Sequence, residues 1–253
     1  MADGVRSNLR IQELLARRSD LSTFVVHLTR QTEDGHSPRK NLRSILNGPK
    51  IEARTPFGPA ATKLLTKSTL DKESQNCVSF SETPLEHLYC LVQEIPKRRF
   101  KLAPYGLAFT KMTARRLGVN PVWYVDITPG HEWLMVPINT LIDRAFERFK
   151  RFRKSPVAQI APFIEQMGSG PGQSGYGYRK EFWWEREWRH RGDFHFSLHD
   201  VALGLAPENR IGEFEKFTKT LGRRVPFVDP KWGMEKIIAH LAGCKGALTP
   251  FDD

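Results

Sequence analysis

Cysteine and long apolar runs are scarce in this sequence of 253 residues, and each scarcity excludes a class of protein. The cysteines lack CxxC spacing and are odd in number, so we expect no disulfide framework and a reducing, cytoplasmic compartment. No apolar run approaches the roughly 18 residues that cross a bilayer. Charged residues stand where a signal peptide needs an apolar stretch, so no secretion signal is expected. The three cysteines are Cys77, Cys90 and Cys244.

Acidic residues are also few relative to basic ones. The 28 Asp and Glu residues face 39 Lys and Arg residues, which gives a net charge of +11. Such an excess indicates an anionic partner, and we favour RNA or single-stranded DNA, with no membrane role. Solvated helix faces and connectors are the alternative explanation for each basic stretch. These stretches are 97–101, 115–116, 144–154 and 186–191.

Strand-like and helix-like segments mix without regular alternation, so we expect an α+β fold with a sheet core flanked by helices. Apolar and β-branched runs predict strands at 21–27, 77–80, 105–110, 121–127 and 181–189, the last being the longest. Helical periodicity predicts helices at 7–19, 41–47, 82–94, 136–155, 208–220 and 232–242. Asn41 is the expected N-cap of the second helix, and Gly48 follows its end. No linker divides the chain, so residues 1–253 are expected to form one domain.

The motifs of several common enzyme chemistries do not occur in this sequence. The sequence contains no Walker A pattern, no GxSxG elbow and no HExxH. A GxGxxG spacing does occur at Gly170, Gly172 and Gly175, but no clear strand precedes it and no helix follows it, so we interpret it as a loop. His190, His195 and His199 lie close together without a second group of ligands, so no metal site is expected.

Three short segments do stand out as a constellation. In FVVHLTR, two polar residues share a strand face at the end of an apolar run. In CVSFSETPLEHLYC, a strand runs into a helix that carries a tyrosine. In WEREWR, carboxylates lie between tryptophans, where burial is costly unless the charge is used or paired. The residues concerned are His27, Thr29, Tyr89, Glu185, Glu187 and Arg189. Each also has an ordinary explanation as a core residue or as one member of an ion pair.

The order of these motifs resembles a known enzyme class. His27 begins H-L-T-R, and N-L-x-x-I-L-x-G-x-x-I-x-A follows at 41–53. The pairs Ser79-Phe80 and Tyr89-Cys90 come next, and WEREWR follows the glycine-rich loop. This order is similar to the ADP-ribosyltransferase domain of the poly(ADP-ribose) polymerase and diphtheria-toxin class. The resemblance implies a split β-sheet core over about 21–195, with a C-terminal helical extension over about 205–253.

The resemblance implies that NAD is the co-substrate and that its nicotinamide–ribose bond is broken. Glu187 would stabilise the oxocarbenium-like ribose. His27 would bind the second ribose with support from Thr29, and the backbone near Leu28 would hold the carboxamide. The remaining NAD contacts would come from Arg30 at the pyrophosphate and from Tyr89 or Phe80 against the nicotinamide ring, because the family's tyrosine is replaced here by Ser79.

The resemblance also suggests where an acceptor would bind. Tyr176 and Tyr178, in the glycine-rich loop, are candidates to stack on exposed bases. Glu185 and Arg189, predicted on the same strand face as Glu187, are further candidates for acceptor contacts.

The middle and third motifs (SFSE, YGLAF, VWYV and EREWR) also resemble AbiGi-type abortive-infection proteins of bacteria. In that group the glutamate before Trp-Arg recurs, which favours Glu187 over Glu185 as the catalytic residue. The combined prediction is an NAD-dependent ADP-ribosyltransferase toxin that modifies nucleic acid in phage defence and has an antitoxin as partner. The alternatives are transfer to a protein, an NAD-dependent RNA 2′-phosphotransferase, and a non-enzymatic antitoxin or binding module with the same fold.

Overall fold

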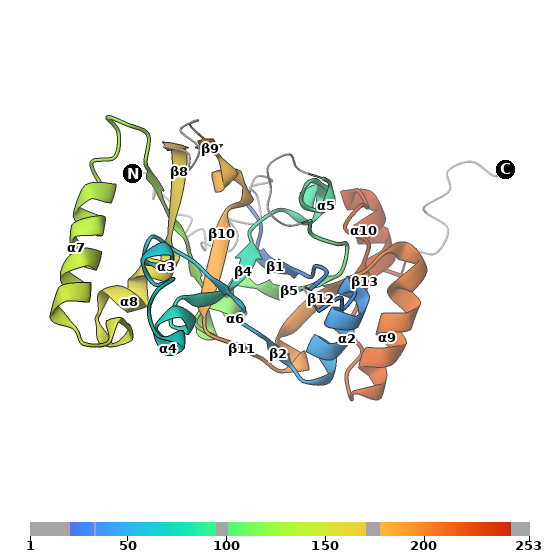
Figure 1. The fold of residues 1–253 in the computed structure, drawn as a ribbon. Coiled ribbons are helices and arrows are strands. Elements are labelled where there is room, and N and C mark those ends of the chain that lie inside the picture. The colour runs from blue at the N-terminus through green and yellow to red at the C-terminus, as the bar shows by residue number, and fades with distance from the viewer. Residues whose placement is uncertain (1–20, 33, 95–100, 171–177, 244–253) are drawn as a thin grey trace, which may run out of the picture.

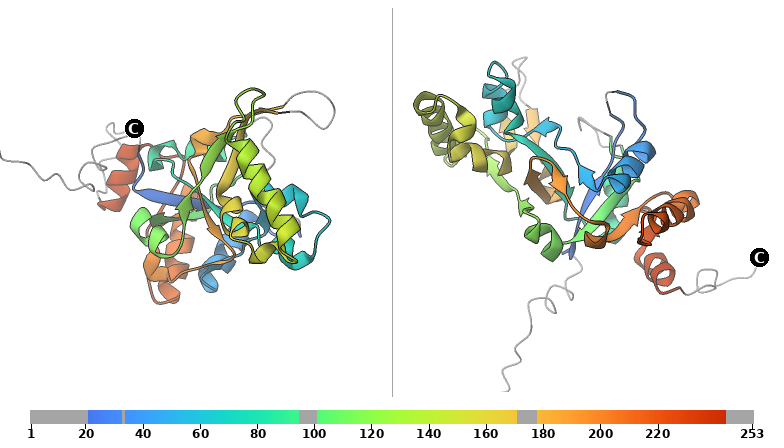
Figure 2. Two further views of the ribbon diagram at one scale, coloured as in Figure 1. Left: turned by 90° about the vertical axis from the view of Figure 1, so that its left-hand side faces the viewer. Right: turned by 90° about the horizontal axis from the view of Figure 1, so that it is seen from below.

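The computed structural model describes residues 21–32, 34–94, 101–170 and 178–243. The helix predicted at 7–19 lies outside these residues. Helices flank an eight-stranded sheet and a smaller three-stranded sheet, so the predicted α+β class is confirmed (Figures 1 and 2). Within the described part of the chain, no helix is long and apolar enough to cross a membrane.

The main sheet runs in the order β13-β12-β5-β1-β4-β10-β6, and β3 pairs with the start of β4. Its central strand β1 carries the apolar run that predicted it, and Val25 and Val26 are fully buried. All neighbours are antiparallel except β12 and β13. The strands are β1 (Phe24–Leu28), β3 (Thr55–Pro56), β4 (Asn76–Ser81), β5 (Gly106–Thr110), β6 (Asn120–Pro121), β10 (Glu187–Arg191), β12 (Val201–Leu205) and β13 (Phe227–Val228).

Helices α2 (Pro38–Asn47), α9 (Ile211–Thr220) and α10 (Met234–Leu241) pack on the main sheet at one end of the molecule (Figure 1). They bury apolar residues in the same cluster as the sheet, so the segment after residue 205 contributes a strand and two helices to this core. Both C-terminal helices were predicted from their periodicity and are confirmed. The short elements α5 (Tyr89–Val92), α6 (Lys111–Arg116) and the pair β2 (Lys50–Ile51) with β11 (Phe194–His195) complete this part.

The second sheet lies at the opposite end, with its own apolar cluster (Figures 1 and 2). Its strand β8 pairs in parallel with β7 and antiparallel with β9. Helix α7 covers it through Ile138, Ile142 and Ala145. The elements here are β7 (Trp123–Asp126), β8 (Ile164–Gly170), β9 (Tyr178–Lys180), α3 (Ala60–Lys63), α4 (Thr69–Glu73), α7 (Met135–Arg148) and α8 (Val157–Ile160). Residues 52–75, where no helix or strand was predicted, contain β3, α3 and α4.

The predicted strand at 181–189 is wrong in its first half. Residues Phe182–Glu185 form a single 3₁₀ turn, and Arg186 has a left-handed backbone with φ of 47°. A strand cannot pass through such a residue, so β10 begins only at Glu187. Glu185 therefore does not share a strand face with Glu187. Its backbone carbonyl accepts a hydrogen bond from the Ser81 hydroxyl at 2.6 Å.

Three helix predictions need correction at their ends. Helix α2 is capped by Ser37, because Pro38 supplies a ready first position and the Ser37 hydroxyl accepts the Lys40 N–H; Gly48 does follow its end. The segment 82–94 breaks into a 3₁₀ turn and α5. Helix α7 ends at Arg148, where Phe149 becomes extended, and Leu141 is half-exposed and not part of the buried stripe.

A glycine fixes the packing of the C-terminal strands. An ideal Cβ at Gly204 would lie 2.2 Å from ring carbons of Phe227, which is fully buried. We expect Gly204→Ala to lower the free energy of unfolding by about 1–3 kcal/mol, because the ring cannot move without opening the core. Urea unfolding would measure this.

The matched control for Gly204→Ala is Gly212→Ala in α9, where a Cβ meets no atom within 4 Å. Removing a helical glycine there should leave stability unchanged or raise it by up to about 1 kcal/mol. Equal stability of the two variants would contradict the packing of β12 against β13.

Candidate functional site

The three strands that carry the predicted site are neighbours in the main sheet, in the order β1, β4, β10. His27, Ser79 and Glu187 lie on these strands in turn. Ser79 is the link between the other two. Its backbone carbonyl accepts a hydrogen bond from His27 Nδ1 at 2.9 Å, and its hydroxyl donates to Glu187 Oε1.

A buried arginine holds Glu187. Arg189 Nε donates to Glu187 Oε1 at 3.0 Å, and Nη2 donates to Oε2 at 2.6 Å. The same Nη2 reaches Glu165 on β8, which also accepts from Lys180 on β9. We call Arg189, Glu187, Glu165, Lys180 and Ser79 the Arg189 cluster. The side chain of Arg189 has no exposed surface at all.

The rest of the Arg189 side chain is also satisfied. Its Nη1 donates to the carbonyl of Pro162 at 2.6 Å, and its guanidinium carbon lies 4.1 Å from the centre of the Phe57 ring. Burial alone would lower the pKa of Arg189, but the carboxylates of Glu187 and Glu165 raise it above its ordinary value. Arg189 is therefore a permanent cation.

The carboxylate on β8 is charged as well. Burial would raise the pKa of Glu165, but Arg189 and Lys180 together hold it below its ordinary value. Two carboxylates thus face two cations in the Arg189 cluster, so its charges balance. This arrangement joins β10 of the main sheet to β8 and β9 of the second sheet.

The sheet register separates His27 from Glu187. Ser81 pairs with Val26 on one side and with Glu187 on the other, so these residues share a face. His27 lies one position further along and faces Phe80, whose ring centre is 5.8 Å from its own. The side chains of His27 and Glu187 consequently leave the sheet on opposite faces.

His27 is held as a neutral side chain. Burial lowers the pKa of His27, and the hydrogen bond to the Ser79 carbonyl offsets this only in part. Because a carbonyl can only accept, the proton of the neutral ring is on Nδ1, and Nε2 is left as an acceptor.

The other residues predicted to bind NAD do not form one open site with Glu187. Leu28 and Phe80 are buried in the main core, and Phe80 packs edge-on against Phe109 and Phe194. Thr29 is buried and donates from its hydroxyl to the carbonyls of Tyr105 and Pro38. The roles in NAD binding implied for Leu28, Thr29 and Phe80 stay predictions.

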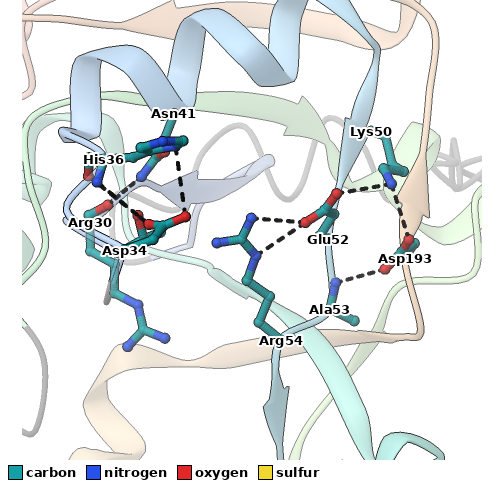
Figure 3. A network of polar contacts seen from close by, with 10 residues as sticks. Arg30, Asp34, His36, Asn41, Lys50, Glu52, Ala53, Arg54 and Asp193 are labelled. Carbon is teal, nitrogen blue, oxygen red and sulfur yellow. Dashed lines mark hydrogen bonds and ion pairs between the residues drawn. The ribbon is translucent and has the colours of Figure 1, made fainter.

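Arg30 lies at the edge of this region, in the loop after β1. Its Nη2 donates to the Thr55 hydroxyl at 3.3 Å, and its carbonyl accepts from the Asn41 side chain at 2.8 Å. Figure 3 shows it beside a network of surface ion pairs that includes Glu52–Arg54 and Lys50–Asp193. The Arg30–Thr55 hydrogen bond ties the loop after β1 to β3, and the ion pairs tie β2 to the turn before β11.

The structure describes the three tyrosines of the predicted site to different extents. Tyr89, on α5, keeps 40% of its surface exposed. Tyr176 lies outside the described residues. Tyr178 is the first residue of β9, and its side chain lies outside the described part.

Sequence reasoning missed several residues of this site. Glu165 lies on β8, where the sequence predicted no strand, and only its pairing with Arg189 distinguishes it. Tyr124 was part of a predicted strand, yet its hydroxyl accepts the Glu187 N–H at 2.9 Å. Burial raises the pKa of Tyr124, so it remains a neutral phenol. Burial likewise raises the pKa of Cys77 to about 12, which leaves no thiolate nucleophile on β4.

Glu82 is a second buried carboxylate near the site. It contacts Lys111 Nζ at 2.7 Å and Arg186 at 3.2 Å, and it accepts from the Trp188 indole at 2.9 Å. Trp188 of the WEREWR segment thus pairs with a carboxylate from outside that segment. Among the described residues, no group of three or more His, Cys, Asp or Glu is placed to hold a metal ion.

A family model described as "Putative abortive phage resistance protein AbiGi, antitoxin" matches residues 45–221. The chain belongs to the AbiGi family. The predicted resemblance to AbiGi-type proteins is therefore confirmed, and every member of the Arg189 cluster lies within the AbiGi match, whereas His27 precedes it. No curated protein and no solved structure matches the chain. The resemblance to ADP-ribosyltransferases stays a prediction.

The lowered pKa of His27 predicts that the stability of the folded protein depends on pH. Its folded pKa is lowered below the ordinary 6.5, so below that pH the unfolded chain binds a proton that the folded chain does not. Stability should then fall as the pH falls, by at most about 1.4 kcal/mol per pH unit. Urea unfolding at about pH 7.5 and about pH 5.5 should show a larger loss for the wild type than for His27→Gln.

His199→Gln is the matched control for this pH effect, because His199 is exposed and has no ion pair among the described residues. It should lose as much stability as the wild type over the same pH interval. A wild-type loss no greater than that of His27→Gln would contradict a half-buried, neutral His27.

Proposed function

We propose that this protein acts in phage defence as an antitoxin, which restrains a toxin by binding it and not by catalysis. The family description supports this role, since it names an antitoxin of abortive phage resistance. The observation that carries the proposal is the two-bonded contact between Glu187 and the fully buried Arg189. The carboxylate expected to act on a substrate is already engaged within the protein.

The physical reason concerns charge. A carboxylate that stabilises an oxocarbenium-like ribose must present an uncompensated negative charge where positive charge develops. Glu187 lies against a guanidinium in a buried setting, and the charge on Glu165 is likewise balanced by Lys180. A ribose cation near Glu187 would meet two opposite charges whose fields largely cancel. Breaking this pair would leave the buried Arg189 with only one of its two carboxylates, which is costly.

A second candidate is NAD-dependent ADP-ribosyl transfer, to nucleic acid or to protein. It is favoured by the chain of contacts from His27 through Ser79 to Glu187 across three adjacent strands. Against it stand the opposite faces of His27 and Glu187 and the buried position of Phe80. RNA 2′-phosphotransfer shares this site and is open to the same objections.

Two assays separate the candidates. Induced alone in bacterial cells, an antitoxin should not arrest growth, whereas co-expression with the toxin of the same defence system should restore growth. The purified protein, given labelled NAD with RNA, single-stranded DNA or cell protein, should transfer no label and release no nicotinamide.

Glu187→Gln is the informative variant in both assays, because it keeps the size of the side chain and removes its charge. If the wild type arrests growth and transfers label while this variant does neither, the transferase is correct and the antitoxin is wrong. If neither protein has activity and co-expression with the toxin does not restore growth, the antitoxin proposal is also wrong.

A further inference from the structure

The end of α7 and the turn that follows it concentrate positive charge at one end of the molecule. Residues 144–154 contain six Lys or Arg residues and a single acidic residue, Glu147. Five of the cations are exposed, and none of these five has an ion-pair partner among the residues that the structure describes. We call them the basic surface: Arg144, Arg148, Lys150, Arg151 and Lys154.

The other basic stretches are largely neutralised where the structure describes them. Arg116 pairs with Asp200 at 2.6 Å. Arg186 pairs with Glu82, and Arg189 pairs with two carboxylates. Residues 97–100 lie outside the described part. Among the basic stretches that the structure describes, the basic surface therefore has the largest number of cations without an ion-pair partner.

Packing holds the backbone of this segment in place. Phe152 is buried and stacks on Phe146, with ring centres 4.3 Å apart. The Arg153 N–H donates to the buried carboxylate of Asp71 at 3.1 Å, and its guanidinium lies 3.7 Å from the same group. One cation is thus used to anchor the turn, and the neighbouring cations are held facing solvent.

The turn also forms a hollow. Phe149, Lys150, Arg151 and Lys154 line an open cavity of about 320 Å³. Three cations around one aromatic ring provide both kinds of contact that single strands use, namely cations for phosphates and a flat ring for an unpaired base. We propose that the basic surface binds single-stranded nucleic acid, with Phe149 contacting a base.

A membrane is a less suitable partner for the basic surface than single-stranded nucleic acid. Val136 is exposed but lies about 18 Å from Arg148 by helix rise, and the exposed Trp133 precedes α7. Leu141 is exposed as well, one turn before Arg144, whereas the other apolar residues of α7 near the basic surface pack on the second core. An interfacial helix needs its cations beside an exposed apolar face. On α7, Leu141 is a single exposed leucine beside the basic surface and does not make such a face.

The test uses fluorescence anisotropy of the full chain with labelled oligo(U) and oligo(dT) of about 12 nucleotides. We expect saturable binding that weakens with salt. The variant Lys150→Gln/Arg151→Gln/Lys154→Gln should weaken binding at least about tenfold and lower the salt slope by about 2, because each phosphate contact contributes about 0.7. Phe149→Leu, which keeps the apolar packing, should weaken binding at least about fivefold.

The matched control removes the same charge elsewhere. Lys216, Lys219 and Lys231 are exposed, so changing all three to Gln should weaken binding less than about twofold. Circular dichroism and thermal unfolding confirm that each variant is folded. Comparing oligo(U) with oligo(dT) distinguishes an RNA partner from a DNA partner.

Three results would overturn the proposal. Equal losses in the two triple variants would mean that net charge alone attracts the oligonucleotide. Binding to vesicles of anionic phospholipid, with no binding to either oligonucleotide, would identify a membrane surface instead. Equal affinity for duplex and single strand, with Phe149→Leu unchanged, would remove the base contact. None of these results depends on whether the protein is an antitoxin or a transferase.

Discussion

The buried guanidinium of Arg189 is the interaction on which the rest of the structure depends. It takes a full positive charge out of water, which is tolerable only because two carboxylates, one carbonyl and an aromatic ring surround it. Those partners come from both sheets and from the segments between them. The position of the second sheet against the first is therefore specified by a charge that has no other stable location.

The same constraint shapes the functional conclusion. A carboxylate that neutralises a buried arginine is part of the architecture, and it is less available for a substrate. In this structure Glu187 has that structural role, whereas Glu82 and Glu165 show that carboxylates in this protein repeatedly hold buried or half-buried cations. A binding role in phage defence is consistent with this pattern, and exposed charge for a partner remains at the turn after α7.

Local signals in the sequence predicted much of the fold. The apolar run of β1, the alternation around Ser79 and the periodicity of α9 and α10 are properties of short segments, so they could be recognised without knowing the tertiary structure. The turn before β10 could not be recognised in this way, because the left-handed backbone of Arg186 follows from no residue preference. The turn is held by hydrogen bonds from the Ser81 hydroxyl to the Glu185 carbonyl and from the Glu82 N–H to the Arg186 carbonyl.

The candidate site was predictable only in part, for the same reason. The sequence indicated that His27, Ser79 and Glu187 matter together, and they do lie on neighbouring strands. It could not show which face each side chain takes, because one residue of register between β1 and β4 decides that. Nor could it identify Glu165, which meets Arg189 across 24 residues of chain.

The most direct test of this account is a double-mutant cycle between Glu187 and Arg189, measured by urea unfolding of Glu187→Gln, Arg189→Met and the double variant. A structural pair predicts that each single change is destabilising, Arg189→Met by about 3–5 kcal/mol, and that the double variant recovers part of the loss. A carboxylate kept for catalysis predicts that Glu187→Gln leaves stability unchanged or raises it, with no coupling to Arg189. That second result would contradict the account.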